Sequence, residues 1–201
     1  MKELIRNSTK FSLGIAVITF VLAALFSIVS TFTLSGVAWG IGMIIVFVIV
    51  FVGVFFDMLG IAAAAADEVP FHAMASERVK GAKESIVIVR NADRFASFCN
   101  DVIGDIAGIV SGTASALVVL QLTVGLGHSE DSLLGQTVSV VFTSVVAAVT
   151  VGGKAFGKSF AIRFSTKIIF QVGKLFYYLD EKLNIKFFDT SKKKRKEQKR
   201  K

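Results

Sequence analysis

The chain has 201 residues, of which 53% are hydrophobic and 19 are phenylalanine, with a mean hydropathy of +0.67 and a net charge of +8 at pH 7. A soluble domain of this length buries a good core without such an apolar excess, so the composition indicates an integral membrane protein. The single cysteine, Cys99, excludes an internal disulfide and a thiolate metal cluster. Because the sequence has no Ser-His-Asp set, glycine-rich phosphate loop or zinc-peptidase motif, we do not expect an enzyme.

Apolar segments in chain order predict four membrane-spanning helices. No charged residue lies between Lys10 and Asp57, and that interval is too long for one crossing, because a bilayer core takes roughly 20 helical residues. We expect it to divide at a loop, STFTLSG (30–36). Helices are favoured over strands because an open strand leaves its backbone unsatisfied in lipid. The expected spans are Phe11–Val29, Val37–Ile61, Phe98–Leu122 and Leu133–Val151, the last with room for two more turns.

The first span has the position of a secretory signal. Its apolar run is longer than a typical signal core, and SGVAWG is a weak cleavage site, so we expect a retained helix. Cleavage is the alternative, and it would leave three spans with the N terminus outside.

The basic residues predict the orientation. All 23 Lys and Arg precede the first span, lie between the second and third, or follow the fourth. The two other loops, STFTLSG and VGLGHSEDSLLG, contain none. The positive-inside bias therefore places both termini in the cytoplasm, and we expect the plasma or inner membrane of a prokaryote.

Two connecting segments mix charged and apolar residues. Residues 67–94 predict cytoplasmic amphipathic helices lying against the membrane, with an ordinary soluble hairpin as the alternative. After Val151, basic residues alternate with phenylalanine and isoleucine, a pattern typical of a basic amphipathic helix at the inner interface.

The ending SKKKRKEQKRK has eight basic residues and one acid. Such a tail attracts anionic lipid by about 1 kcal/mol per basic residue near the surface. A solvated tail that only sets topology is the alternative, and nucleic-acid binding is disfavoured because no folded binding module accompanies the tail. The expected lipid-binding residues are Lys192, Lys193, Lys194, Arg195 and Lys196.

Three acids, Asp57, Asp101 and Asp105, lie within the apolar runs. An unpaired charge there costs about 2.5–3.5 kcal/mol on insertion scales, so a functional site is the default hypothesis. Asp57 precedes Asp67 by ten residues and Asp105 follows Arg94 by eleven, which is about 15–16 Å at helical rise. Asp57 and Asp105 are therefore expected at a similar depth, reached from the cytoplasm.

Several chemistries suit these acids. Asn100, Ser111, Thr113 and Ser115 add oxygen atoms on the helix of Asp101 and Asp105, and oxygen-only ligation suits Mg²⁺ or Ca²⁺. The acids could instead form a structural salt bridge with Lys154, at the cytoplasmic end of the fourth span, or pack in protonated form. The residues alone leave all three open.

Four motifs together resemble a known family. FFDMLGIAAAAADEVPFHAMASERVKGAK resembles the first conserved block of the transmembrane domain shared by cyclin M proteins and bacterial CorC-type magnesium transporters. RNADRFASF, CNDVIGDIAGIVSG and GGKAFGK follow in the family's order, so the resemblance covers about residues 50–180. It implies an all-α homodimer of three membrane helices plus juxtamembrane helices, with a cytoplasmic C terminus and divalent-cation transport.

The resemblance also implies a ligand set. Family members hold Mg²⁺ with a serine, asparagines and a glutamate. Asp57 matches the serine; Asn100 with Gly104, or Asp101 with Asp105 in a shifted register, matches the asparagines; and Lys154 matches the glutamate. Metal ligands are thus expected at Asp57, Asn100, Asp101 and Asp105, with Lys154 as an internal counter-ion that competes with the ion.

The expected organisation is an N-terminal segment with an extra span (1–36), a CorC-like membrane domain (37–185) and a polybasic tail (186–201), without the family's cytoplasmic regulatory domains. Two functions follow: transport of divalent cations through the carboxylate site, or a transport-inactive membrane scaffold or partner subunit with a structural Asp–Lys cluster. A proton-coupled carrier using the acids with Lys154 is a third.

Overall fold

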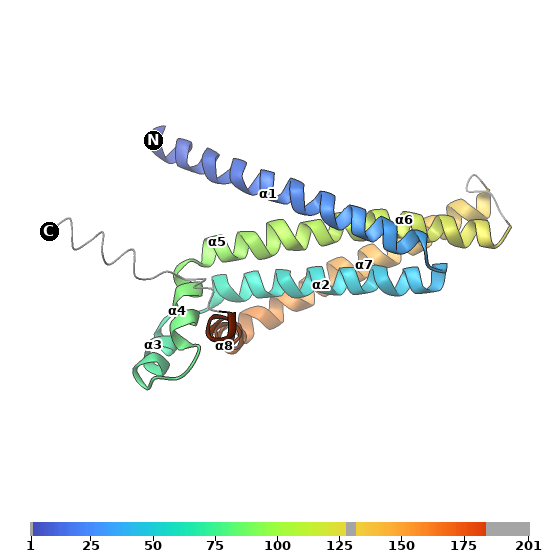
Figure 1. Cartoon of the computed structure of the whole chain (residues 1–201). Helices are drawn as coiled ribbons and strands as arrows, with labels where there is room; N and C mark the ends of the chain where they lie inside the picture. Colours follow the sequence, from blue (N-terminus) through green and yellow to red (C-terminus); the bar gives the residue numbers. More distant parts are fainter. Residues whose placement is uncertain (1, 128–131, 184–201) are drawn as a thin grey trace.

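The computed structural model describes residues 2–127 and 132–183, and every regular element in these ranges is a helix (Figure 1). The elements are α1 (Lys2–Ser35), α2 (Trp39–Ala65), α3 (Val69–Ser76), α4 (Ala82–Arg90), α5 (Ala92–Ser97), the π-helix η1 (Phe98–Gly104), α6 (Asp105–Gly125), α7 (Leu133–Arg163) and α8 (Ser165–Leu183). Four helical stretches are long and apolar enough to cross a membrane: Ser12–Ser35, Trp39–Ala65, Ala92–Gly125 and Leu133–Arg163. The predicted all-α membrane protein with about four spans is confirmed.

Small residues on α2 let α6 pack closely against it. A Cβ added to Gly53 would come within 2.7 Å of the Ala107 Cβ, and one added to Gly42 within 2.7 Å of Val118 Cγ2. Close backbone approach of this kind is how helices associate where lipid removes the hydrophobic driving force. Leu34, Val46, Val50, Ala114, Val118 and Val146 form the buried core at this level.

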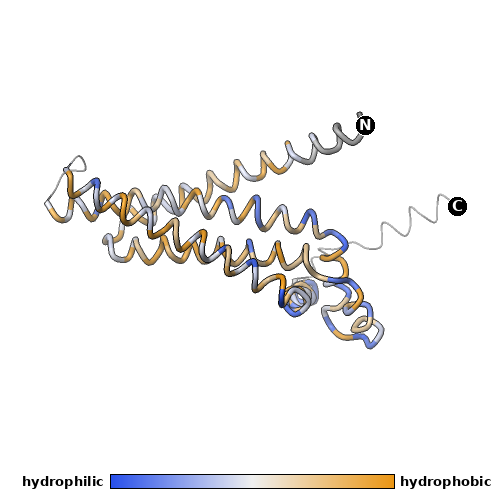
Figure 2. Tube along the Cα trace, turned by 180° about the vertical axis from the view of Figure 1, so that it is seen from behind, coloured by the Kyte–Doolittle hydropathy of each residue, from blue (hydrophilic) through white to orange (hydrophobic). Residues whose placement is uncertain are grey.

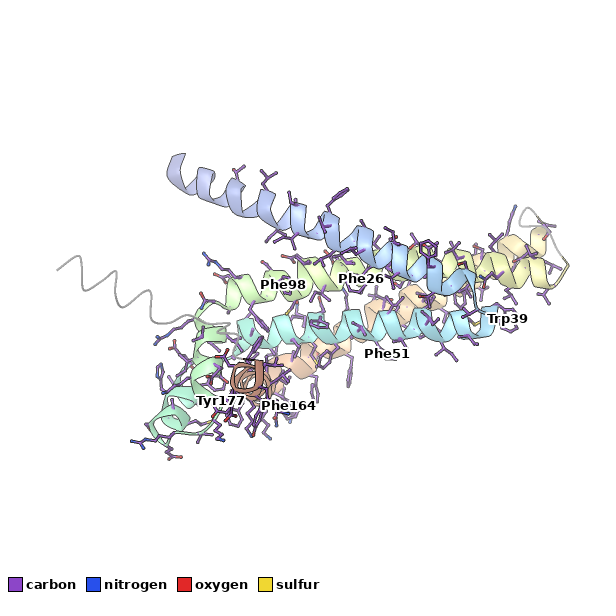
Figure 3. The ribbon with its side chains drawn as sticks, viewed as in Figure 1. Phe26, Trp39, Phe51, Phe98, Phe164 and Tyr177 are labelled. Atoms are coloured by element: carbon purple, nitrogen blue, oxygen red, sulfur yellow. The ribbon has the colours of Figure 1, made fainter. Side chains whose placement is uncertain are left out.

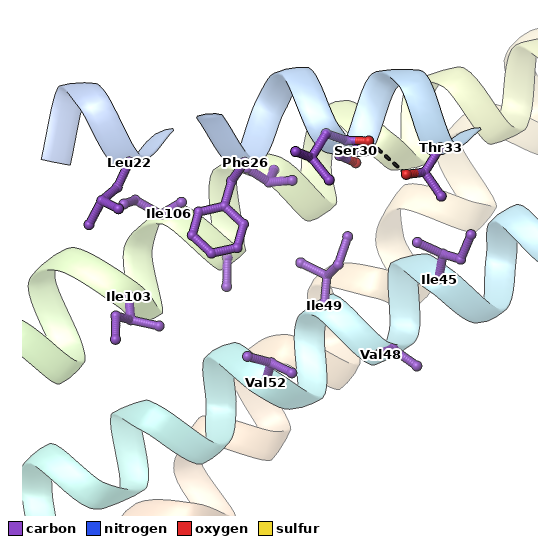
Figure 4. A pocket seen from close by; sticks show the side chains of 13 residues that line it. Leu22, Phe26, Ser30, Thr33, Ile45, Val48, Ile49, Val52, Ile103 and Ile106 are labelled. Atoms are coloured by element: carbon purple, nitrogen blue, oxygen red, sulfur yellow. Dashed lines mark hydrogen bonds between the residues drawn. The ribbon is translucent and has the colours of Figure 1, made fainter. Parts of the chain in front are cut away.

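Helix α1 is the loosest part of the bundle, and it diverges from the other spans toward its N terminus (Figure 1). Phe20 and Phe32 on α1 remain 75% and 77% exposed. The divergence leaves a groove of about 270 Å³ between α1, α2 and α6, lined by apolar side chains such as Phe26, Ile49 and Ile106 (Figure 4). Such a surface suits hydrocarbon and offers no charged group for chemistry.

Two helix ends differ from the prediction. The expected loop at 30–36 is wrong, because α1 continues to Ser35 and the turn is confined to the next three residues. The fourth span does not end at Val151, because α7 runs about three more turns to Arg163. Gly153 and Gly157 lie on this extension and face α2: an added Cβ would be 3.2 Å from Val54 Cγ2 and 3.7 Å from the Met58 Cβ. Packing against α2 therefore offsets the poor helix propensity of these glycines.

A second core lies where α3, α4 and α8 meet the ends of α2 and α7. Ser85 of α4 donates a hydrogen bond to the Ile169 carbonyl of α8 at 3.2 Å, and a Cβ on Gly173 would fall 2.1 Å from the Ser85 Oγ. Within residues 67–94 the chain forms α3, α4 and the start of α5, and α4 packs on α8, so the predicted helices are present; their position against the membrane stays a prediction. The buried members of this core are Ala62, Ala63, Phe71, Ile86, Ile88, Ala161 and Ile169.

Hydropathy separates along the molecule (Figure 2). Hydrophobic residues follow the four long helices, whereas hydrophilic residues gather on α3, α4 and α8 at one end. We refer to this as the α8 end. The separation is the pattern of a bundle that crosses the bilayer with an interfacial layer on one side.

Candidate functional site

Asp57 lies near the α8 end of α2, between two glycines. Gly53 and Gly60 flank it by about one turn on either side, and both are buried. Because these glycines have no side chain, the segment that contains Asn100 and Gly104 approaches the α2 backbone closely. A Cβ on Gly104 would be 3.7 Å from the Asp57 Oδ1 and 3.8 Å from the Gly53 carbonyl oxygen. The carboxylate therefore faces a neighbouring helix.

The facing segment, Phe98–Gly104, is a π-helix. A π-helix inserts extra residues into a helical turn and is found frequently at functional sites. It carries Asn100 and Asp101 and ends immediately before Asp105, the first residue of α6. The extra residue per turn changes the angular relation between Asp101 and Asp105, which α-helical spacing would have placed on one face.

Lys154 of α7 joins the two carboxylates. Its Nζ lies 3.7 Å from the Asp57 Oδ1 and 3.9 Å from the Asp105 Oδ1. The side chain of Asp57 is 15% exposed, that of Lys154 is 30% exposed and that of Asp105 is 64% exposed. Three helices thus contribute one charge each to an ionic cluster that we call the Asp–Lys–Asp cluster, with the acid on α2 innermost.

The contacts in this cluster are ion pairs at longer than hydrogen-bond distance, since N–H···O bonds run about 2.7–3.2 Å. When all three groups are ionised, one ammonium faces two carboxylates, so the cluster carries a net charge of minus one. An excess negative charge at a partly exposed position attracts a further cation, and the Asp105 carboxylate is open to receive it.

Asn100 provides a further oxygen beside the cluster. Its Oδ1 is buried and has no hydrogen-bond partner among the described residues. The amide rests on the bare backbone of Gly60, where an added Cβ would meet the Oδ1 at 2.0 Å. A buried acceptor without a partner costs about 1–3 kcal/mol, so this oxygen is an unsatisfied polar atom packed on α2 one turn from Asp57.

The structure therefore brings together part of the predicted ligand set. Asp57, Asp105 and Lys154 meet, and Asn100 packs against α2 one turn from Asp57. Asp101 is exposed, and its side chain forms no ion pair or hydrogen bond with any described residue. Across residues 2–127 and 132–183, no group of three or more His, Cys, Asp or Glu is arranged to hold a metal ion.

The three hydroxyl groups expected near the acids serve another purpose. Ser111 donates to the Gly108 carbonyl at 2.9 Å, Thr113 to the Val110 carbonyl at 3.0 Å and Ser115 to the Ser111 carbonyl at 2.6 Å. These bonds satisfy each hydroxyl within α6, as is usual for such side chains in membrane helices. The tail residues Lys192–Lys196 lie outside the described part of the chain, so their predicted lipid contact stays a prediction.

Sequence reasoning missed two features of the site. One is the π-helix, for which the sequence carries no clear signal. The other is the close packing of the Asn100 amide against Gly60 of α2.

Comparison of the chain with protein-family models, with curated proteins and with solved structures finds no match. The resemblance to magnesium transporters therefore rests on the four motifs alone. The homodimer and the magnesium ligand set that it implies stay predictions.

Proposed function

We propose that this chain is a polytopic membrane protein that binds a divalent cation such as Mg²⁺ at the carboxylates of Asp57 and Asp105 and carries it across the membrane. Lys154 is the internal counter-ion that the incoming cation displaces. The observation that carries the proposal is the position of the Lys154 ammonium, within 4 Å of both carboxylates. The α8 end is proposed to face the cytoplasm, on the basis of the positive-inside bias.

The chemistry of the available donors supports this proposal. Two carboxylates and the unpartnered amide oxygen of Asn100 are hard oxygen ligands, which Mg²⁺ and Ca²⁺ prefer. Mg²⁺ keeps several of its waters, so a site with few protein ligands suffices for a hydrated ion. Asp105 is exposed enough to meet such an ion first, and Asp57 lies deeper.

The ammonium of Lys154 competes with a bound cation for the carboxylates of Asp57 and Asp105. A cation that enters must replace the attraction between Lys154 and the two acids, whereas the empty cluster keeps those acids compensated within the bilayer. This arrangement lowers the affinity for the cation and lowers the cost of the cation-free state. Both effects favour release, which a carrier needs as much as binding.

A transport-inactive scaffold or partner subunit is the second candidate, and the same ion pairs favour it. Both carboxylates that meet already have a cationic partner, and the described residues assemble no group of three acidic, histidine or cysteine ligands. In that case the Asp–Lys–Asp cluster would only hold α2, α6 and α7 together.

Magnesium flux in proteoliposomes tests the proposal. The wild-type chain is expected to move Mg²⁺ faster than empty vesicles, D57N to abolish that flux and K154E to change it strongly. Lys158 is exposed, lies one turn further along α7 and has no ion pair with a described residue, so K158E is the matched control and should behave as wild type. Absence of flux in the wild-type chain, with none gained in K154E, would refute transport and leave the scaffold.

A further inference from the structure

A cationic and aromatic corner lies where α7 ends and α8 begins, away from the Asp–Lys–Asp cluster. The guanidinium carbon of Arg163 lies 6.0 Å from the ring centroid of Phe164, and the Nζ of Lys167 lies 5.7 Å from the same centroid. Two cations from consecutive helices thus share one aromatic ring. Phe164 is the residue between the two helices, and Figure 3 labels it beside α8, at the end of the bundle that carries α3 and α4.

These two cations have no acidic partner in the described part of the chain. Neither Arg163 nor Lys167 forms an ion pair with a described residue, whereas Arg90 at the same end of the molecule contacts the Glu68 carboxylate at 2.5 Å. Stacking on an aromatic face orients a cation without neutralising it. The corner therefore presents two oriented positive charges that no acid among residues 2–127 and 132–183 compensates.

An aromatic ladder leads from this corner along α7. The rings of Phe156 and Phe160 have centroids 6.5 Å apart and are stacked, and the Phe160 and Phe164 centroids are 4.7 Å apart. Phe156 is 76% exposed and Phe160 is 42% exposed, so the ladder is an outward surface of a span. Positive charge at the helix end and apolar rings along the span match the two parts of a phospholipid.

We propose that Arg163, Lys167 and Phe164 form a binding site for the headgroup phosphate of an anionic phospholipid, whose acyl chain lies along Phe160 and Phe156. Arginine binds phosphate bidentately through its planar fork, and lysine adds a point charge. The site is independent of the proposed transport function and of the polybasic tail.

The exposed ladder is what favours a lipid over a free phosphate ion or an acidic protein segment. A free phosphate ion makes no contact with Phe156 and Phe160, whose rings would then face other lipid chains. An anionic lipid uses the cations and the rings together, and its position at the end of a span is where headgroups lie.

Native mass spectrometry of the full chain in detergent, titrated with phosphatidylglycerol or with phosphatidylcholine, tests the site. The first phosphatidylglycerol is expected to bind more tightly than phosphatidylcholine, and R163Q/K167Q to weaken it by roughly 25-fold, a factor of about five per cation. The matched control K80Q/K83Q removes the same charge from the same end of the molecule, and it should leave this first binding event unchanged.

Two further arms separate the site from a general attraction to anions. F164L keeps both charges but removes the ring that orients them, and it should weaken phosphatidylglycerol binding while the thermal unfolding of the protein stays that of a folded bundle. Inorganic phosphate at the same concentration should not displace the lipid. Equal losses in R163Q/K167Q and K80Q/K83Q, equal binding of the two lipids, or displacement by inorganic phosphate would each overturn the proposal.

Discussion

Replacing Lys154 by methionine gives the most direct measure of the Asp–Lys–Asp cluster. Methionine keeps most of the length and apolar stem of the side chain, but it removes the ammonium that lies 3.7 Å from Asp57 and 3.9 Å from Asp105. At these separations each unscreened pair is worth about 4 kcal/mol at an effective dielectric constant of 20. The two pairs do not contribute equally, because the two acids differ in exposure.

The contribution of Asp105 is small. Its side chain is 64% exposed, and exposed ion pairs are worth about 0–1 kcal/mol after solvent screening. Asp57 is 15% exposed, so its uncompensated carboxylate in K154M accounts for most of the loss. Leaving one member of a buried pair unpaired costs about 3–5 kcal/mol. We expect K154M to lose about 3 kcal/mol of unfolding free energy.

Thermal unfolding in detergent provides the assay. A loss of about 3 kcal/mol corresponds to a decrease of roughly 6–12 °C in melting temperature for a chain of this size. K158M is the control, because Lys158 is exposed and has no acidic partner among the described residues, and it should melt as the wild type does. D57N in the K154M background should recover most of the loss, because it removes the stranded charge.

The double-mutant comparison also shows how the reasoning fails. If K154M melts at the wild-type temperature, the ion pairs contribute nothing and the cluster is not a structural element. If K154M is destabilised but D57N does not recover the loss, the effect comes from packing of the lysine stem and not from the charge on Asp57.

Three other predictions follow from contacts of the described residues. Millimolar Mg²⁺ should raise the melting temperature of the wild-type protein but not of D57A, and equal shifts would contradict a bound ion at Asp57. G60A should cost about 1–3 kcal/mol because its Cβ would fall 2.0 Å from a buried amide oxygen, whereas G152A, which faces open space, should be neutral; equal melting of the two variants would refute this. The pKa of Glu68 lies below its ordinary value of 4.5, because His72 and then Arg90 form hydrogen bonds with its carboxylate. The stability that these bonds add is present above pH 4.5 and is lost as the pH falls through the lower folded-state pKa. The difference in melting temperature between wild type and E68Q should therefore shrink over that pH range.

Sequence and structure agree best on the spans. The charge-free interval before Asp57 and the apolar run after Phe98 predict membrane crossings because insertion in lipid depends on the composition of each segment and little on its neighbours. The same local property predicts helices, since a lipid-exposed backbone must satisfy its own hydrogen bonds. The amphipathic character of residues 67–94 was likewise visible in the sequence.

The site was only partly predictable. Spacing along the chain placed Asp57 and Asp105 at one depth, and the structure places both beside the same ammonium. It could not show that Asp101 would be left out, because which carboxylate of this helix meets Lys154 depends on how the helix is rotated and placed against α7. It also could not place the end of α7. Gly153 and Gly157 have low helix propensity, and only their packing against α2 offsets it.

The sequence by itself thus determined that this is a membrane protein, about how many helices are apolar enough to span the bilayer, and which acidic residues lie within those spans. Each of these properties depends on local composition. Only the tertiary structure decided which acids form ion pairs with Lys154, that Asn100 packs against Gly60, and which cations lie over the ring of Phe164. The physical reason is that these pairings depend on the rotation and close approach of helices far apart in the chain, which side-chain packing sets only when the bundle forms.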